Sequence, residues 1–268
     1  MNKIGIVAGG GDLPVLIAKE ASVNGAEVYC AAFEGFARPD IKEFSAACEF
    51  FKLGKIQAPI DFFKKNGVIE IILIGNISHI NIFRDLNPDL RGASLLLGLK
   101  DKSPMGIFRA LSKELEKDGL KPADTSMFLK ESLAQKGLLA GPKVSQKTYE
   151  DLSFAMETAS KIASLDIGLS VAVKDKAVIA VEAAEGTDAC IKRAGEILGG
   201  SKGFVLGKAA RPNQDFRFDL PVIGKTTVEN LLQAGGYALA VESQKTLIVN
   251  KKETLDFASE KNISIIGF

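Results

Sequence analysis

Short apolar runs alternate with helical patterns over the first third of the chain, and this alternation constrains the fold more than any other feature. Strands are predicted over Lys3–Ala8, Ala26–Phe33 and Val68–Ile74, and helices over Leu13–Asn24 and Pro59–Asn66. Alternating strands and helices form parallel sheets, because each helix carries the chain back across the sheet to the next strand. The pattern therefore predicts an N-terminal α/β domain of Rossmann-like type.

The second half of the chain has a different pattern. Two predicted strands, Leu169–Lys174 and Ala177–Glu182, are separated by the spacing of a hairpin. Further strands and helices follow in irregular order up to the last predicted strand, Ile263–Gly267. Hairpins mixed with helices predict a C-terminal α+β domain with a mixed sheet.

The chain of 268 residues is long enough for two domains. Gly141 and Pro142 mark a candidate linker at residues 138–144. We therefore expect the N-terminal domain over residues 1–137 and the C-terminal domain over residues 145–268.

Composition and motif content exclude several classes of protein. Lys plus Arg number 34 and Asp plus Glu 33, so a net charge of +1 provides no field that would attract nucleic acid. The three cysteines form no CxxC pair, and the longest apolar run is too short to cross a membrane. His79 is the only histidine and no GxSxG motif is present, which argues against a serine hydrolase. With no signal-peptide pattern at the N-terminus, we expect a cytoplasmic protein.

Gly9, Gly10 and Gly11 separate the first predicted strand from the first predicted helix. The backbone N–H groups of such a loop bind phosphate together with the helix dipole, and Asp12 is expected to cap the helix. Pro14 stands where the dinucleotide pattern GxGxxG requires its third glycine, so the match to that pattern is incomplete. The loop predicts a nucleotide phosphate site, with a tight structural turn as the alternative.

A first polar cluster follows the predicted strand that ends at Glu182. Glu185, Thr187 and Asp188 lie in the turn into the next helix, where Thr187 is placed to cap the helix and Asp188 suits its first turn. Capping leaves the glutamates unexplained, and Mg²⁺ binds carboxylates together with phosphate oxygens. The cluster is therefore a candidate metal and substrate site, with helix capping as the alternative.

A second polar cluster spans residues 207–227. Its candidate residues are Lys208, Arg211, Gln214, Asp215, Asp219 and Thr226. Lys and Arg recognise phosphate, Asp holds Mg²⁺ or orients water, and a helix N-terminus accepts an anion. The cluster predicts a site for a phosphorylated substrate, with a solvated loop of local salt bridges as the alternative.

Long motifs in both halves carry a family resemblance. They are IGIVAGGGDLPVLIAKEA, DIG at residues 166–168, AVEAAEGTDACIKRAG and RPNQDFRFDLPVIGKTTVENLLQAG. With these motifs the chain resembles the LpxI-type UDP-2,3-diacylglucosamine pyrophosphatases of lipid A synthesis. The resemblance implies an Mg²⁺-dependent hydrolase that cleaves UDP-2,3-diacylglucosamine to 2,3-diacylglucosamine 1-phosphate (lipid X) and UMP. It also implies that Asp219, in the sequence DLP, is the essential aspartate.

The residues and the resemblance together give a set of site expectations. Asp219 and Asp188 are the candidate catalytic residues, and these two with Asp215 are the candidate Mg²⁺ ligands. The candidate substrate-binding residues are Gly9, Gly10, Gly11, Asp12, Glu185, Thr187, Lys208, Arg211, Gln214 and Thr226.

The expected partners follow from the implied substrate. They are a UDP-linked diacylated glucosamine lipid, the inner face of the cytoplasmic membrane through peripheral contact, and a second copy of the chain in a homodimer. Two alternatives stay open: a nucleotide-sugar-binding sensor without turnover, and an NAD(P)-dependent oxidoreductase, against which Pro14 argues.

Overall fold

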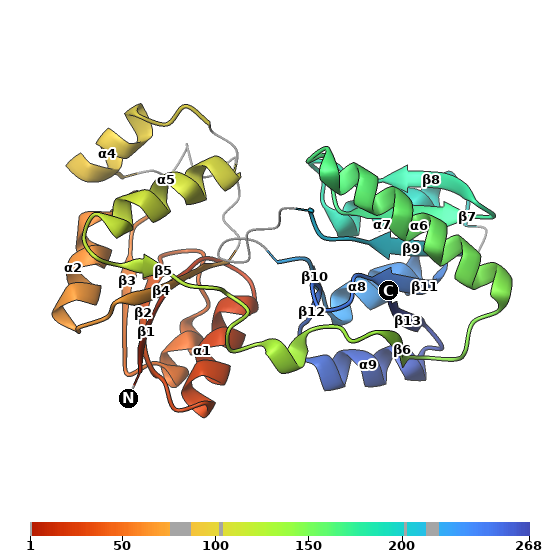
Figure 1. Ribbon diagram of the computed structural model, residues 1–268, viewed down its shortest axis with the longest axis horizontal. Coiled ribbons are helices and arrows are strands. Elements are labelled where there is room, and N and C mark those ends of the chain that lie inside the picture. The colour runs from red at the N-terminus through yellow and green to blue at the C-terminus, as the bar shows by residue number, and fades with distance from the viewer. Residues whose placement is uncertain (1, 76–86, 102–103, 201–202, 213–219) are drawn as a thin grey trace. The chain divides into compact units, whose positions relative to one another are not determined.

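The computed structural model describes residues 2–75, 87–101, 104–200, 203–212 and 220–268 (Figure 1). The described residues divide into two compact units, one ending at Leu129 and the other beginning at Lys130. The linker predicted at residues 138–144 therefore lies within the second unit. Residues 138–140 of this predicted linker belong to strand β6 (Gly137–Ala140). Gly141 lies against the backbone of Ile263, where a Cβ on Gly141 would be 2.3 Å from the Ile263 carbonyl oxygen.

The first unit contains the elements that the alternating pattern predicts, together with several shorter ones. They are β1 (Lys3–Ala8), α1 (Leu13–Val23), β2 (Glu27–Phe33), the 3₁₀ helix η1 (Pro39–Phe44), β3 (Ala47–Phe51), α2 (Gln57–Lys65), β4 (Glu70–Ile74), α4 (Leu90–Leu97), α5 (Pro104–Glu116) and β5 (Lys121–Pro122).

The strands of this unit form a parallel sheet in the order β3-β2-β1-β4-β5. Helices cover both faces of the sheet (Figure 1), so its central strands are almost entirely apolar and buried. Val7, Ala31 and Leu73 pack with Phe63 of α2 and Leu115 of α5. The prediction of an N-terminal α/β domain is confirmed.

The segment around Phe44, Phe50 and Phe51 differs from expectation. The spacing of these phenylalanines predicts core positions on helices, but Phe50 and Phe51 lie in strand β3 at the edge of the sheet. Cross-strand pairing with β2 decides the conformation here, with Phe33 opposite Phe51.

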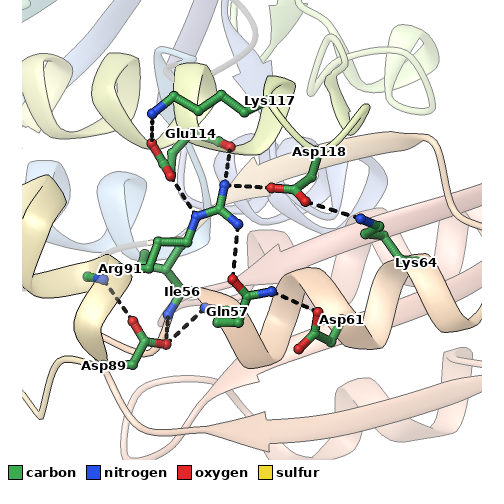
Figure 2. A network of polar contacts seen from close by, with 10 residues as sticks. Ile56, Gln57, Asp61, Lys64, Asp89, Arg91, Glu114, Lys117 and Asp118 are labelled. Atoms are coloured by element: carbon green, nitrogen blue, oxygen red, sulfur yellow. Dashed lines mark hydrogen bonds and ion pairs between the residues drawn. The ribbon is translucent and has the colours of Figure 1, made fainter.

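Asp89 joins the beginnings of two helices in the first unit (Figure 2). Its carboxylate accepts hydrogen bonds from the backbone N–H of Gly92 in α4 at 2.7 Å, and from those of Ile56 and Gln57 at 3.0 and 2.9 Å at the start of α2. Burial opposes ionisation, but these three donors outweigh it and hold the pKa of Asp89 below its usual value. Beside it, Arg91 binds Glu114 and Asp118 at the end of α5 and beyond.

We expect Asp89→Ala to lower the free energy of unfolding by about 2 kcal/mol, because it leaves N–H groups of two helices without their acceptor. A depressed carboxyl pKa stabilises the fold above the unfolded pKa of about 4, and this contribution is lost as pH falls through the folded value. Urea unfolding between pH 7 and pH 3 measures both effects. Asp61→Ala is the control, because exposed Asp61 accepts only the Gln57 side-chain amide among described contacts; equal losses in both variants would contradict the account.

The second unit contains a larger set of elements. They are η2 (Lys130–Ser132), β6, α6 (Gln146–Ser164), β7 (Ser170–Lys174), β8 (Ala177–Val181), α7 (Thr187–Ile197), β9 (Phe204–Lys208), β10 (Val222–Ile223), α8 (Lys225–Gln233), β11 (Gly236–Val241), β12 (Leu247–Ile248), α9 (Lys251–Glu260) and β13 (Ser264–Gly267).

The described strands of this unit form a sheet in the order β6-β13-β11-β9-β7-β8, while β10 and β12 pair separately. Strands β9, β11 and β13 are parallel, and β6 and β7 are antiparallel to their neighbours. The mixed sheet predicted for the C-terminal half is thus confirmed. Ser145 caps α6, accepting the Thr148 backbone N–H at 3.2 Å, where the sequence offers Ser145 or Thr148 as the cap. In the described parts of both units, every helix is too short or too polar to cross a membrane.

Candidate active site

The glycine loop lies at the carboxyl edge of the first sheet, where the strand order reverses. β1 runs into Gly9, whose N–H donates to the Ile74 carbonyl at the end of β4 at 2.8 Å. Gly75 comes so close that a Cβ there would lie 2.6 Å from the carbonyl carbon of Gly9, and Gly11 has a φ of +92°. The crevice where strand order reverses is the place at which open α/β sheets bind ligands. Glycine at these positions therefore shapes a loop fit for a phosphate.

Asp12 occupies the N-cap position of α1 but does not cap the helix with its side chain. Its backbone is already helical, at φ −85° and ψ −23°, whereas a capping side chain needs an extended backbone to reach the first-turn N–H groups. The carboxylate instead binds Arg38, which also binds Asp40. The capping prediction is therefore wrong for Asp12. Pro14 fits the first turn of α1, where a missing N–H leaves no bond unmade.

In the second unit, four strand ends bring polar side chains to one edge of the sheet. Ser170 begins β7, Glu182 follows β8, Lys208 ends β9 and Glu242 follows β11. Strands β8, β9 and β11 all end at this edge, because β7 is antiparallel to both β8 and β9. Helix α7 begins after the short turn that follows β8, and Thr187 in its first turn contacts Ser170 and Glu182, so the N-terminus of α7 lies at the same edge.

Lys208 is hydrogen-bonded to a side chain at the start of α7, which in turn contacts Glu182 and Ser170. Its Nζ donates to Thr187 Oγ1 at 2.8 Å, and the Thr187 hydroxyl donates to Glu182 Oε2 at 3.0 Å. Ser170 Oγ lies 3.3 Å from the same hydroxyl. Lys208 is 7% exposed, Glu182 9% and Ser170 0%. A lysine ammonium fixed at a strand end is suited to bind phosphate oxygens.

Thr187 is the first residue of α7 rather than its cap. Gly186 takes the cap position with a φ of +85°, a conformation that threonine rarely adopts. The Thr187 hydroxyl is hydrogen-bonded to Glu182 and Lys208 instead. The prediction that Thr187 caps α7 is therefore wrong. Asp188 lies exposed in the first turn, as predicted.

Glu185, expected to bind substrate, is tied to its own surroundings. It accepts the Ala183 N–H at 3.1 Å and forms an ion pair with Arg193 at 2.5 Å. Backbone hydrogen bonding, beginning with its own N–H, and then Arg193 hold the pKa of Glu185 below its usual value. These contacts give Glu185 a structural part in the turn; its substrate role stays a prediction.

Glu242 and Asp166 hold the segment that follows Lys208. Glu242 accepts the Ala210 N–H at 2.8 Å and Lys245 Nζ at 2.6 Å, and Asp166 accepts Arg211 Nε at 2.5 Å. Arg211, a predicted phosphate ligand, lies in the segment that follows β9. One of its guanidinium nitrogens is already bound by the Asp166 carboxylate.

Three predicted site residues, Gln214, Asp215 and Asp219, lie outside the described residues. His79, which is not among the predicted site residues, lies outside them too. Thr226 is exposed in the first turn of α8. Among the described side chains, no three of the types His, Cys, Asp and Glu gather as a metal site. Of the three predicted Mg²⁺ ligands, Asp188 is the one that lies within the described residues.

The sequence analysis missed the parts played by Ser170, Glu182 and Glu242. The sequence singles out only Glu182 among them, as a glutamate that helix capping leaves unexplained. A sequence signal exists for both glutamates, because the apolar pattern predicts strands over Ala177–Glu182 and Ala238–Glu242 and so places each glutamate at a strand end. Which strand ends share an edge depends on strand order, which the sequence does not show.

The chain is a two-domain α/β protein that belongs to the LpxI family. The LpxI N-terminal domain model matches residues 3–132, and the LpxI C-terminal domain model matches residues 135–266. The chain is also 29% identical to the UDP-2,3-diacylglucosamine pyrophosphatase LpxI of Caulobacter vibrioides, across 100% of this chain and 98% of that protein.

Two solved structures give only distant likenesses. One is an N⁵-carboxyaminoimidazole ribonucleotide synthetase from Thermotoga maritima, 16% identical, with a TM-score of 0.28 over 76% of this chain and 44% of that one. The other is an N⁵-carboxyaminoimidazole synthetase from Staphylococcus aureus, 18% identical, with a TM-score of 0.24 over 64% and 37%. The chain spans less than half of either protein, and at these TM-scores neither likeness bears on its fold or function.

Proposed function

We propose that this chain is a pyrophosphatase that hydrolyses UDP-2,3-diacylglucosamine to UMP and 2,3-diacylglucosamine 1-phosphate. The observation that carries the proposal is family membership over both domains, together with a full-length relative named for this activity. Lys208 supports the same function, because a pyrophosphate requires fixed positive charge while its negative charge shifts during cleavage.

We propose that the first unit is a Rossmann-like domain that binds the UDP part of the substrate. The parallel strand order β3-β2-β1-β4-β5 supports this, because it matches the first five strands of the Rossmann order 3-2-1-4-5-6. The loop of Gly9, Gly10 and Gly11 would bind phosphate through the backbone N–H groups that come after Gly9, whose own N–H donates to the Ile74 carbonyl. Glu34 follows β2 and is exposed, which is where such folds bind a ribose hydroxyl.

We propose that Mg²⁺ takes part, held by Asp188, Asp215 and Asp219. Carboxylate oxygens suit this hard cation, which commonly binds one or two carboxylates and substrate phosphates. The exposed position of Asp188 next to Thr187 supports its assignment. When bound, Mg²⁺ supplies positive charge against the pyrophosphate. Lys208 and Arg211 contribute further positive charge from the chain itself.

The proposed substrate also implies a place of action. A diacylated lipid resides in a membrane, so we propose peripheral contact with the inner face of the cytoplasmic membrane. A homodimer remains a prediction, which sedimentation equilibrium of the purified protein tests.

The proposed function predicts UMP release from UDP-2,3-diacylglucosamine with Mg²⁺ present, and loss of release after exhaustive EDTA treatment. Chromatography of the nucleotide products measures both. Full activity in EDTA would remove Mg²⁺ from the proposal. Binding of UDP-sugar without UMP release would favour a sensor, and tight binding of NADH or NADPH would favour an oxidoreductase.

A further inference from the structure

The directions of the hydrogen bonds around Thr187 are fixed by chemistry. The Lys208 ammonium only donates and an ionised Glu182 only accepts, so Thr187 accepts from Lys208 and donates to Glu182. Because the single Thr187 hydroxyl proton is donated to Glu182, the Ser170 hydroxyl can only donate to Thr187 Oγ1. The negative charge of Glu182 therefore acts on the Lys208 ammonium through a polarised hydroxyl.

The backbone around this chain of bonds is fixed on both sides. Ser170 and Lys208 are register partners on β7 and β9. The Ser170 carbonyl accepts the Glu182 N–H at 2.9 Å, and a Cβ on Gly168 would lie 2.0 Å from the Glu182 carbonyl oxygen. The glycine of the DIG motif therefore allows the backbone carrying Glu182 to pack against the start of β7.

Burial gives these bonds their effect. Lys208 and Glu182 are each more than nine-tenths buried, so water competes weakly for their hydrogen bonds. Thr187 does not cap α7, because Gly186 occupies that position. Helix capping, the ordinary role of a threonine at this position, therefore does not explain its hydroxyl.

We infer that Glu182 and Thr187 are positioning residues, which hold the Lys208 ammonium in the place where it binds the pyrophosphate of the substrate. The inference rests on the proposed function and adds two residues to its machinery. An ammonium on a flexible stem binds phosphate most effectively when its position is set before the substrate arrives, since no reorganisation is then required during cleavage.

The test compares Thr187→Val, which removes the hydroxyl at nearly equal shape, with Thr187→Ser, which keeps it. We expect Thr187→Val and Glu182→Gln to lower kcat about 10- to 100-fold, the range for partners that orient a functional group, while Thr187→Ser stays close to the wild type. In the Lys208→Met background, Thr187→Val should lower kcat no further, because its effect passes through the ammonium. Circular dichroism and thermal unfolding check that each variant folds.

A second readout does not depend on turnover. The ammonium of Lys208 should give a slowly exchanging ¹⁵N NMR signal in the wild type and in Thr187→Ser, assigned by its loss in Lys208→Met. Thr187→Val should broaden or remove that signal. An unchanged signal in Thr187→Val would overturn the inference. So would a further loss of kcat when Thr187→Val is added to Lys208→Met, if that loss is as large as in the wild-type background. An inactive wild type with the expected NMR pattern would instead overturn the proposed function and leave the positioning contact supported.

Discussion

Asp219→Ala is expected to fold normally and to lower the rate of UMP release at least roughly 1,000-fold, which is about 4 kcal/mol of transition-state stabilisation. The family resemblance identifies this residue with the essential aspartate, and in the proposed mechanism its carboxylate holds Mg²⁺ or orients water. A loss of this size is expected for a group that acts on the reacting atoms. Single-turnover rates with saturating enzyme measure the effect on the chemical step.

Asp256→Ala is the matched control for this prediction. Asp256 is an exposed aspartate on α9, so its removal should leave both the rate and the melting temperature close to the wild type. A folded Asp219→Ala variant that retains more than a tenth of the wild-type rate would contradict the assignment of the essential aspartate.

Lys208→Met is expected to lower kcat/KM by roughly 100-fold, or about 2.7 kcal/mol. Methionine keeps an unbranched apolar stem in the buried site but removes the charge that Thr187 and Glu182 hold in place. The chemical step should suffer more than binding, because charge stabilisation increases as the pyrophosphate bond breaks. Steady-state kinetics over a range of substrate concentrations separate the two effects.

Lys147→Met is the matched control for the lysine. Lys147 lies on α6 and pairs with Asp175 in the turn between β7 and β8, where its side chain is 74% exposed. Its replacement should change kcat/KM less than about twofold, since an exposed ion pair contributes little. Equal losses in the two variants would show that Lys208 has no special role.

The regular parts of the fold could be predicted because local pattern and tertiary structure agree there. Buried strands such as Lys3–Ala8 and a capped helix such as α6 have clear signals in sequence. Strands β6 and β10 could not be predicted, because they are short and their pairing depends on partners far along the chain. The misplaced domain boundary has the same cause, since Gly141 and Pro142 are typical of a linker until β6 is seen to pair with β13.

The sequence yields a set of candidate site residues but not their arrangement. Lys208 and Thr187 were both expected to bind substrate, whereas their hydrogen bond depends on the meeting of β9 and the start of α7. The preference of threonine for cap positions predicts a cap at Thr187, but Gly186 occupies that position with a positive φ. The same preference predicts a cap at Asp12, whose carboxylate instead binds Arg38, a residue 26 positions further along the chain.

The most direct test of the central claim is the identity of both products from one reaction. Purified protein is incubated with UDP-2,3-diacylglucosamine and Mg²⁺, and the products are identified by mass spectrometry. Pyrophosphate cleavage gives UMP and 2,3-diacylglucosamine 1-phosphate in equal amounts, which is the predicted result. Formation of UDP and free 2,3-diacylglucosamine, or recovery of intact substrate from folded protein, would contradict it.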